Sequence, residues 1–138
     1  MTDRAARCER VIDALGDAVF LLDTEGVIRL WNPGAEELFG HRAAELEGRT
    51  IDAILPERFR ERHWAGWKRA MEGGETKYGR RQVLKTPVER ADGSEVVVDL
   101  TVSFVTEEGE VTGMAAVARA ADPEDDPANG DRQRAGAE

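Results

Sequence analysis

The sequence predicts a small α+β domain in which one five-stranded antiparallel sheet carries its helices on one face. Two strand-forming segments open the domain, three more close it, and the middle of the chain is helical. Chains that group their strands and helices in this way, instead of alternating them, form α+β folds with antiparallel sheets. A length of 138 residues suits one domain with a modest tail.

The first segment, residues 1–16, is predicted to be an amphipathic helix outside the sheet. Its apolar side chains recur at helical spacing and form one stripe. The members of this stripe are Ala5, Cys8, Val11, Ile12 and Leu15. Two interpretations are open, because such a helix can cap the core of its own domain or pair with a second copy of the chain.

The domain proper, residues 17–119, is predicted to begin with a hairpin. Apolar strand formers fill 18–23 and 27–31, and a Thr-Glu-Gly turn separates them. Asn32 can then cap a helix that has Pro33 at its first position, where the missing N–H has no cost. This helix ends at Gly40, and short helical turns over 43–46 and near 51–55 follow.

The longest predicted helix covers 56–71. It starts with Pro56 and the acidic Glu57, which suits the positive end of the helix dipole, and it ends at Gly73 and Gly74. Helical spacing places one set of side chains on a single face. That set is Phe59, His63, Gly66, Trp67 and Ala70.

Three strands are predicted over 79–90, 95–105 and 111–118. The turn at 91–94 reads Ala-Asp-Gly-Ser, a strong hairpin signal, and apolar residues alternate along the second strand. Gly113 in the third strand allows another backbone to approach closely. Residues 120–138 contain little that can build a core and are predicted to be a disordered acidic tail.

Composition narrows the class of function. The net charge of −9 repels phosphate backbones, so direct nucleic-acid binding is not expected. No apolar run approaches the ~20 residues that cross a bilayer, and the charged N-terminus does not resemble a secretory signal, so a cytoplasmic location without membrane insertion is expected. One cysteine and two histidines exclude an internal disulfide and a zinc site of several Cys or His ligands.

The carboxylates show no acid–base pairing, and no activated nucleophile or phosphate loop is present, so no enzyme activity is expected.

Two segments in this order resemble the PAS family. Residues 17–40, DAVFLLDTEGVIRLWNPGAEELFG, are similar to the opening hairpin, asparagine and helix of PAS domains. Residues 89–95, ERADGSE, are similar to the central hairpin turn of the family. The resemblance implies a PAS-like sheet and helical arm enclosing a cavity, and it implies that Asn32 braces the local backbone.

The resemblance further implies a sensory signal-transduction module that binds a small ligand or cofactor. Ligand binding would favour one of two arrangements of the sheet and the first helix, and a homodimer contact or a partner signalling protein would receive the change. Alternation and helix face, with the resemblance for Arg69, predict the residues of this site. They are Phe20, Leu22, Ile54, Phe59, His63, Trp67, Arg69, Val83, Leu100, Val102, Met114 and Ala116. The alternative is a ligand-free module whose cavity is filled by its own side chains and which binds a copy of itself or another protein.

Cofactors also follow from the resemblance. Residues 55–63, LPERFRERH, are similar to the long-helix start of haem PAS domains in oxygen-sensing histidine kinases. The resemblance implies that His63 would ligate haem iron and that Arg69 would reach a haem propionate. Light-sensing relatives form a flavin adduct through a cysteine near the position of 49–55, where this chain has none, so a flavin adduct is not expected.

Overall fold

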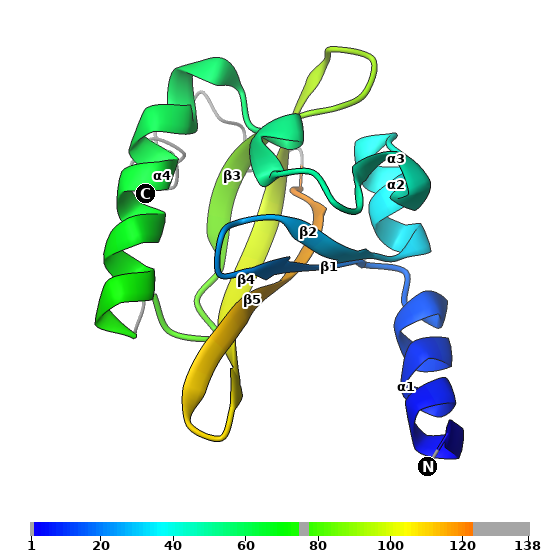
Figure 1. The fold of residues 1–138 in the computed structure, drawn as a ribbon. Coiled ribbons are helices and arrows are strands. Elements are labelled where there is room, and N and C mark those ends of the chain that lie inside the picture. Colours follow the sequence, from blue (N-terminus) through cyan, green and yellow to red (C-terminus); the bar gives the residue numbers. More distant parts are fainter. Residues whose placement is uncertain (1, 75–77, 123–138) are drawn as a thin grey trace.

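The computed structural model describes residues 2–74 and 78–122, and it places five strands in one antiparallel sheet of order β2–β1–β5–β4–β3 (Figure 1). The strands are β1 (Ala18–Asp23), β2 (Ile28–Trp31), β3 (Leu84–Glu89), β4 (Glu95–Glu107) and β5 (Glu110–Ala120). The sheet confirms the α+β prediction, because the opening hairpin pairs through β1 with β5 of the closing three-stranded meander.

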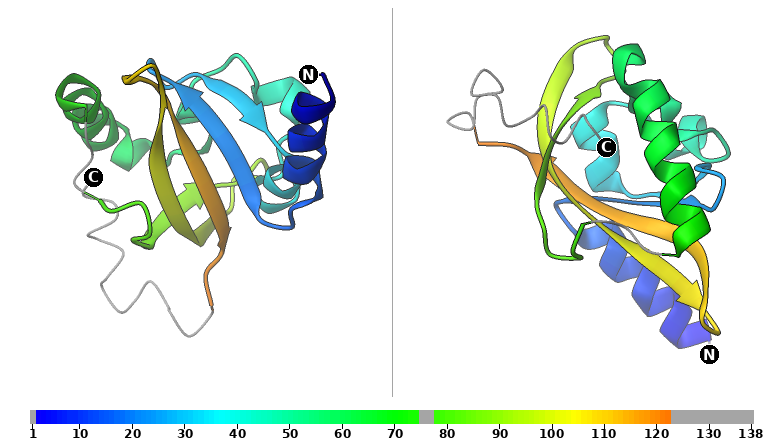
Figure 2. Two further views of the ribbon diagram at one scale, coloured as in Figure 1. Left: turned by 90° about the horizontal axis from the view of Figure 1, so that it is seen from below. Right: turned by 90° about the vertical axis from the view of Figure 1, so that its left-hand side faces the viewer.

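The helices of the middle segment gather over one face of this curved sheet (Figures 1 and 2). They are α2 (Pro33–Phe39), α3 (Ala43–Leu46), the 3-10 helix η1 (Ile51–Ile54) and α4 (Glu57–Gly73). In Figure 1, α4 stands apart from α2 and α3, on the other side of the β1–β2 hairpin. The helical arm therefore has two parts, with α2 and α3 on one side of the hairpin and α4 on the other.

The N-terminal helix α1 (Thr2–Ala14) forms as predicted, but it does not cap the core. Figure 1 shows it projecting from the end of the domain next to α2. Val11 in this helix and Leu15 directly after it are 55% and 45% exposed, and Ile12 is half-buried. The interpretation of this helix as a cap is therefore wrong, since its stripe stays largely open to solvent.

Asn32 joins three parts of the chain at the end of β2. The buried side chain accepts hydrogen bonds through Oδ1 from the N–H groups of Ala35 (2.9 Å) and Val19 (2.8 Å). Its Nδ2 donates to the carbonyl oxygens of Ile12 (2.9 Å) and Asp17 (3.2 Å). These bonds cap α2, as predicted, and tie the end of α1 to the start of β1.

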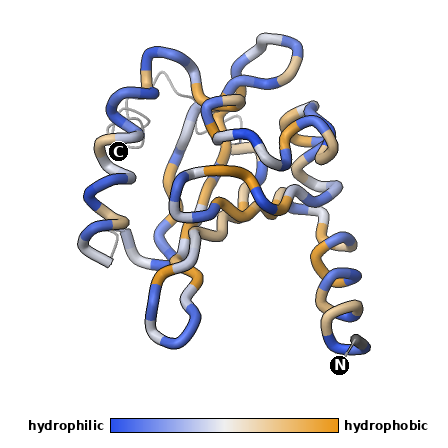
Figure 3. Tube along the Cα trace, viewed as in Figure 1, coloured by the Kyte–Doolittle hydropathy of each residue, from blue (hydrophilic) through white to orange (hydrophobic). Residues whose placement is uncertain are grey.

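The core lies between the sheet and the helical arm. Figure 3 shows hydrophobic colour along the central strands and hydrophilic colour at the turns. An aromatic cluster of Phe20, Trp31 and Phe39 holds α2 on the sheet, with ring centroids 5.2 to 5.9 Å apart. Among the described residues, no helix is both long and apolar enough to cross a membrane.

The close approach predicted at Gly113 is confirmed. A Cβ atom at this position would lie 2.4 Å from the carbonyl oxygen of Leu22 on the neighbouring strand β1. Several strand limits differ from the prediction. Strand β5 continues through Ala120, which pairs with Val98, so the predicted tail begins later, and its residues 123–138 lie outside the described residues.

The third strand also starts later than predicted, at Leu84 instead of Gly79. The N–H of Gln82 donates to the carbonyl oxygen of Gly79 (3.0 Å), so these residues form a turn. Strand β3 lies at the edge of the sheet, where Pro87 is tolerated because a missing N–H there removes no bond between interior strands.

Candidate ligand-binding site

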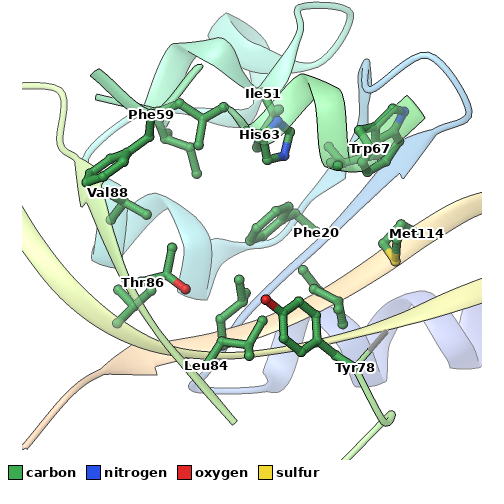
Figure 4. A pocket seen from close by; sticks show the side chains of 18 of the residues that line it. Phe20, Ile51, Phe59, His63, Trp67, Tyr78, Leu84, Thr86, Val88 and Met114 are labelled. Atoms are coloured by element: carbon green, nitrogen blue, oxygen red, sulfur yellow. The ribbon is translucent and has the colours of Figure 1, made fainter. Parts of the chain in front are cut away.

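A cavity of about 480 Å³ lies between α4 and the inner face of the sheet (Figure 4). Four of the five strands contribute side chains to its floor, and α4, η1 and α2 supply its remaining walls. The sheet residues that line it are Phe20, Leu22, Leu84, Thr86, Pro87, Val88, Val98, Leu100, Val102, Met114 and Ala116. This volume and this mostly apolar lining are typical of small-molecule sites.

One face of α4 forms the wall opposite the sheet. The face predicted from helical spacing is confirmed, because all of its members line the cavity. These are Phe59, His63, Gly66, Trp67 and Ala70. No residue of α4 is fully buried, and its partly buried Trp64 and Trp67 pack against the core.

Two tryptophans fasten α4 to neighbouring segments. The indole N–H of Trp64 donates to Oδ1 of Asp52 in η1 (2.7 Å), and that of Trp67 donates to the carbonyl oxygen of Thr24 (2.9 Å). The ring of Trp64 lies where a side chain at Gly26 would be, since a Cβ atom there would meet the ring at 2.3 Å. The position of α4 is therefore coupled to the β1–β2 turn and to η1.

His63 is the polar group at the centre of this wall. Its imidazole stacks against Trp67, with ring centroids 6.0 Å apart, and meets Trp64 edge-on at 4.9 Å. Nδ1 is buried and has no hydrogen-bond partner among the described residues. Burial lowers the pKa of His63 below its ordinary value, and the nearby Asp52 carboxylate only partly opposes this effect. The imidazole is therefore neutral at pH 7, the form that binds metals and exchanges hydrogen bonds with neutral ligands.

The remaining polar groups of the lining lie near α4 and β3. Figure 4 shows the hydroxyl groups of Tyr78 and Thr86 turned toward the cavity. Arg69, an exposed residue of α4, also lines the cavity, and none of the described residues that line it is acidic. In the part of the chain that the structure describes, the site therefore combines an apolar interior with one permanent positive charge.

The structure brings together eleven of the twelve residues predicted for this site. They are Phe20, Leu22, Ile54, Phe59, His63, Trp67, Arg69, Leu100, Val102, Met114 and Ala116. Their role in binding stays a prediction. The placement of Val83 is wrong: it precedes β3 and is 53% exposed. Pairing of Leu84 with Leu100 and of Thr86 with Val98 turns the even-numbered residues of β3 inward, so Val83 falls on the other parity.

Several lining residues were missed by the sequence reasoning. Val98 carries the same alternation signal as Leu100 and Val102, and Gly66 and Ala70 belong to the predicted face of α4, so these could have been found. Leu84, Thr86 and Val88 become inward residues only through their pairing with β4. Phe39, Ile51, Leu55 and Tyr78 reach the cavity from loops and short helices, for which spacing gives no signal, and Pro87 reaches it from the edge strand β3.

The chain is similar to known proteins in both sequence and fold. A family model described as PAS fold matches residues 12–121. An uncharacterized protein of Azorhizobium caulinodans is 36% identical over 104 residues, and the oxygen sensor protein DosP of Escherichia coli is 31% identical over 98 residues. These matches cover 75% and 70% of the chain but only 14% and 12% of the two relatives. The crystal structure of a PAS domain from Colwellia psychrerythraea superposes with a TM-score of 0.72 at 18% identity, covering 86% of this chain and 98% of that one.

Proposed function

The chain belongs to the PAS fold family, whose relatives include sensors, and on this premise we propose that its cavity binds one small, mainly apolar molecule as a signal. The protein would bind this molecule and would not catalyse a reaction on it. The bound molecule would shift α4 against the sheet, and a partner protein or a second copy of the chain would receive the change.

The observation that carries this proposal is the cavity itself. Protein interiors are packed to the density of organic crystals and contain few voids larger than a water molecule. A cavity of about 480 Å³ under α4 is much larger than such voids and falls in the range of small-molecule sites. Its walls include Phe59 and Trp67 on one side and Leu100 and Met114 on the other, which suits an apolar guest.

A path for the signal is supported by the bonds around the cavity. A guest that presses on Trp67 acts on Thr24 in the β1–β2 turn through the indole hydrogen bond. At the other end of β2, Asn32 bonds to the carbonyl oxygen of Ile12 in α1. A shift between two arrangements of the hairpin would therefore reach α1, where the exposed Val11 and the adjacent Leu15 offer a contact surface.

The test compares two variants in which an alanine of α4 is replaced by phenylalanine. Ala70 lines the cavity and Ala65 is exposed on the opposite side of the helix, so Ala70→Phe fills the cavity and Ala65→Phe does not. The probe is N-phenyl-1-naphthylamine, a neutral apolar dye that fluoresces when it leaves water. We expect stoichiometric binding by the wild type and by Ala65→Phe, and a loss of affinity of about tenfold or more in Ala70→Phe.

Equal binding by both variants would place the dye elsewhere on the surface and contradict the proposal. Absence of dye binding by the folded wild type would contradict it too, and would favour the ligand-free interaction module. Circular dichroism spectra of all three proteins establish that each is folded.

A haem is the second candidate, favoured by the imidazole of His63. The ring is neutral, lines the cavity, and makes no hydrogen bond with the described residues, so it suits an axial iron ligand. His63 would hold the iron, and Arg69 would pair with a propionate carboxylate. When bound, the haem would supply an iron centre that can take a diatomic gas.

The haem candidate is tested by adding haem to the purified protein and recording its absorption spectrum. We expect a sharp Soret band with one haem per chain in the wild type and loss of that band in His63→Ala. His41→Ala is the control, because His41 lies in the turn after α2 and does not line the cavity. A band that persists in His63→Ala, or no band in the wild type, would remove haem as a candidate.

A further inference from the structure

We infer that the cavity selects amphipathic anions, molecules with an apolar body and one carboxylate, and that Arg69 at its rim determines this preference. This inference rests on the proposed function and adds the chemical class of the ligand. It follows from the distribution of charge around the cavity.

The charge of the cavity is opposite to that of the whole chain. The protein carries 28 acidic and 19 basic residues, with a net charge of −9. Among the described residues that line the cavity, however, no carboxylate occurs, and Arg69 is the one permanently charged side chain. An anion near the outer surface meets repulsion, while an anion at this rim meets a positive charge.

The guanidinium group of Arg69 is available for a ligand. Within residues 2–74 and 78–122 it makes no hydrogen bond or ion pair, although Glu72 follows one turn later on α4. Other arginines are engaged: Arg58 holds Glu95 through two hydrogen bonds of 2.6 and 2.8 Å, and Arg119 holds Asp17. Arg69 therefore keeps its paired N–H donors, the geometry that matches a carboxylate.

Polar and basic residues follow Arg69 along the chain, after α4. Tyr78 also lines the cavity, and two exposed arginines, Arg80 and Arg81, follow it within three residues along the chain. A carboxylate held here would keep contact with water, so the pair avoids most of the desolvation penalty of a buried ion pair. The apolar body of the same molecule would enter between Trp67 and Leu100.

The test uses two probes with the same apolar chain, decanoate and decan-1-ol, at submicellar concentrations. The affinity of each probe is measured by its displacement of N-phenyl-1-naphthylamine from the wild type, from Arg69→Gln and from Arg62→Gln. Arg62 is the matched control, an exposed arginine of α4 that does not line the cavity. We expect Arg69→Gln to weaken decanoate about tenfold and decanol less than about twofold, and Arg62→Gln to change neither. Added salt should weaken decanoate selectively in the wild type.

Two results would overturn the inference while leaving the cavity proposal intact. One is an equal effect of Arg69→Gln on both probes, or no effect on either. The other is a wild type that binds the neutral dye and decanol but not decanoate. Failure of the folded wild type to bind the dye at all would be a failure of the proposed function itself.

Discussion

Replacement of Asn32 by alanine is expected to lower the free energy of unfolding by about 3–5 kcal/mol. The side chain is only 2% exposed, and it satisfies the N–H of Val19 and the carbonyl oxygens of Ile12 and Asp17 as well as capping α2. Alanine removes this partner from groups in buried or part-buried positions, where each unsatisfied group costs about 1–3 kcal/mol. Urea unfolding followed by circular dichroism measures the loss.

Thr50→Ala is the matched control for this variant. Thr50 stands at the cap position of η1, but its exposed side chain makes no capping bond, so the change should stay within about 0.5 kcal/mol. A loss in Asn32→Ala that is as small as this control would show that water replaces the side chain and that the bonds stabilise little. Hydrogen exchange should also become faster in the last turn of α1 of the Asn32→Ala protein, because its bond to Ile12 is lost.

Replacement of Phe39 by alanine is expected to cost about 3–5 kcal/mol of stability. Phe39 is 1% exposed and packs with its ring centroid 5.2 Å from Trp31 and 5.9 Å from Phe20. It is also the last residue of α2, and its carbonyl oxygen accepts from Ala91 in the β3–β4 turn. The substitution removes the ring that joins α2 to the sheet, and urea unfolding at 25 °C gives the difference.

Val83→Ala serves as the control for the loss of apolar side-chain volume. Val83 is 53% exposed and makes no part of the core, so a change within about 0.5 kcal/mol is expected. A large loss in Val83→Ala would mean that its side chain is buried after all. A small loss in Phe39→Ala would mean that the neighbouring rings collapse into the space and recover most of the contacts.

Much of this fold could be predicted because its signals are local. Asn32, Pro33 and Gly40 mark both ends of α2, and in the structure Gly40 has the left-handed φ of +83° that ends the helix. The turn at 91–94 closes through the N–H of Arg90 and the carbonyl oxygen of Ser94 (2.7 Å). Such features depend on backbone preferences and bonds within a few residues, so the residue types identify them directly.

The wall of the cavity on α4 was also predictable, but the β3 wall was not. A helix has a rigid period, so the spacing from Phe59 to Ala70 identifies a face once the helix is recognised. Apolar residues occur both at Val83, just before β3, and at Leu84, its first residue, and the sequence contains no reason to expect one and not the other to face the cavity. A slip of one residue turns every side chain of a strand to the other face, and only pairing with β4 decides between the two.

Residue order and spacing alone were sufficient for the α+β class, the capped helix after the first hairpin, the apolar face of α4 and the position of His63 on it. The exposure of α1 and the inward residues of β3 came from the assembled molecule. So did the lack, among the described residues, of a hydrogen-bond partner for Nδ1 of His63 and for the guanidinium of Arg69. The reason is that the first set arises from helical and strand periods within one segment. The second set depends on which distant segments meet and on which polar groups are left without a partner when they do.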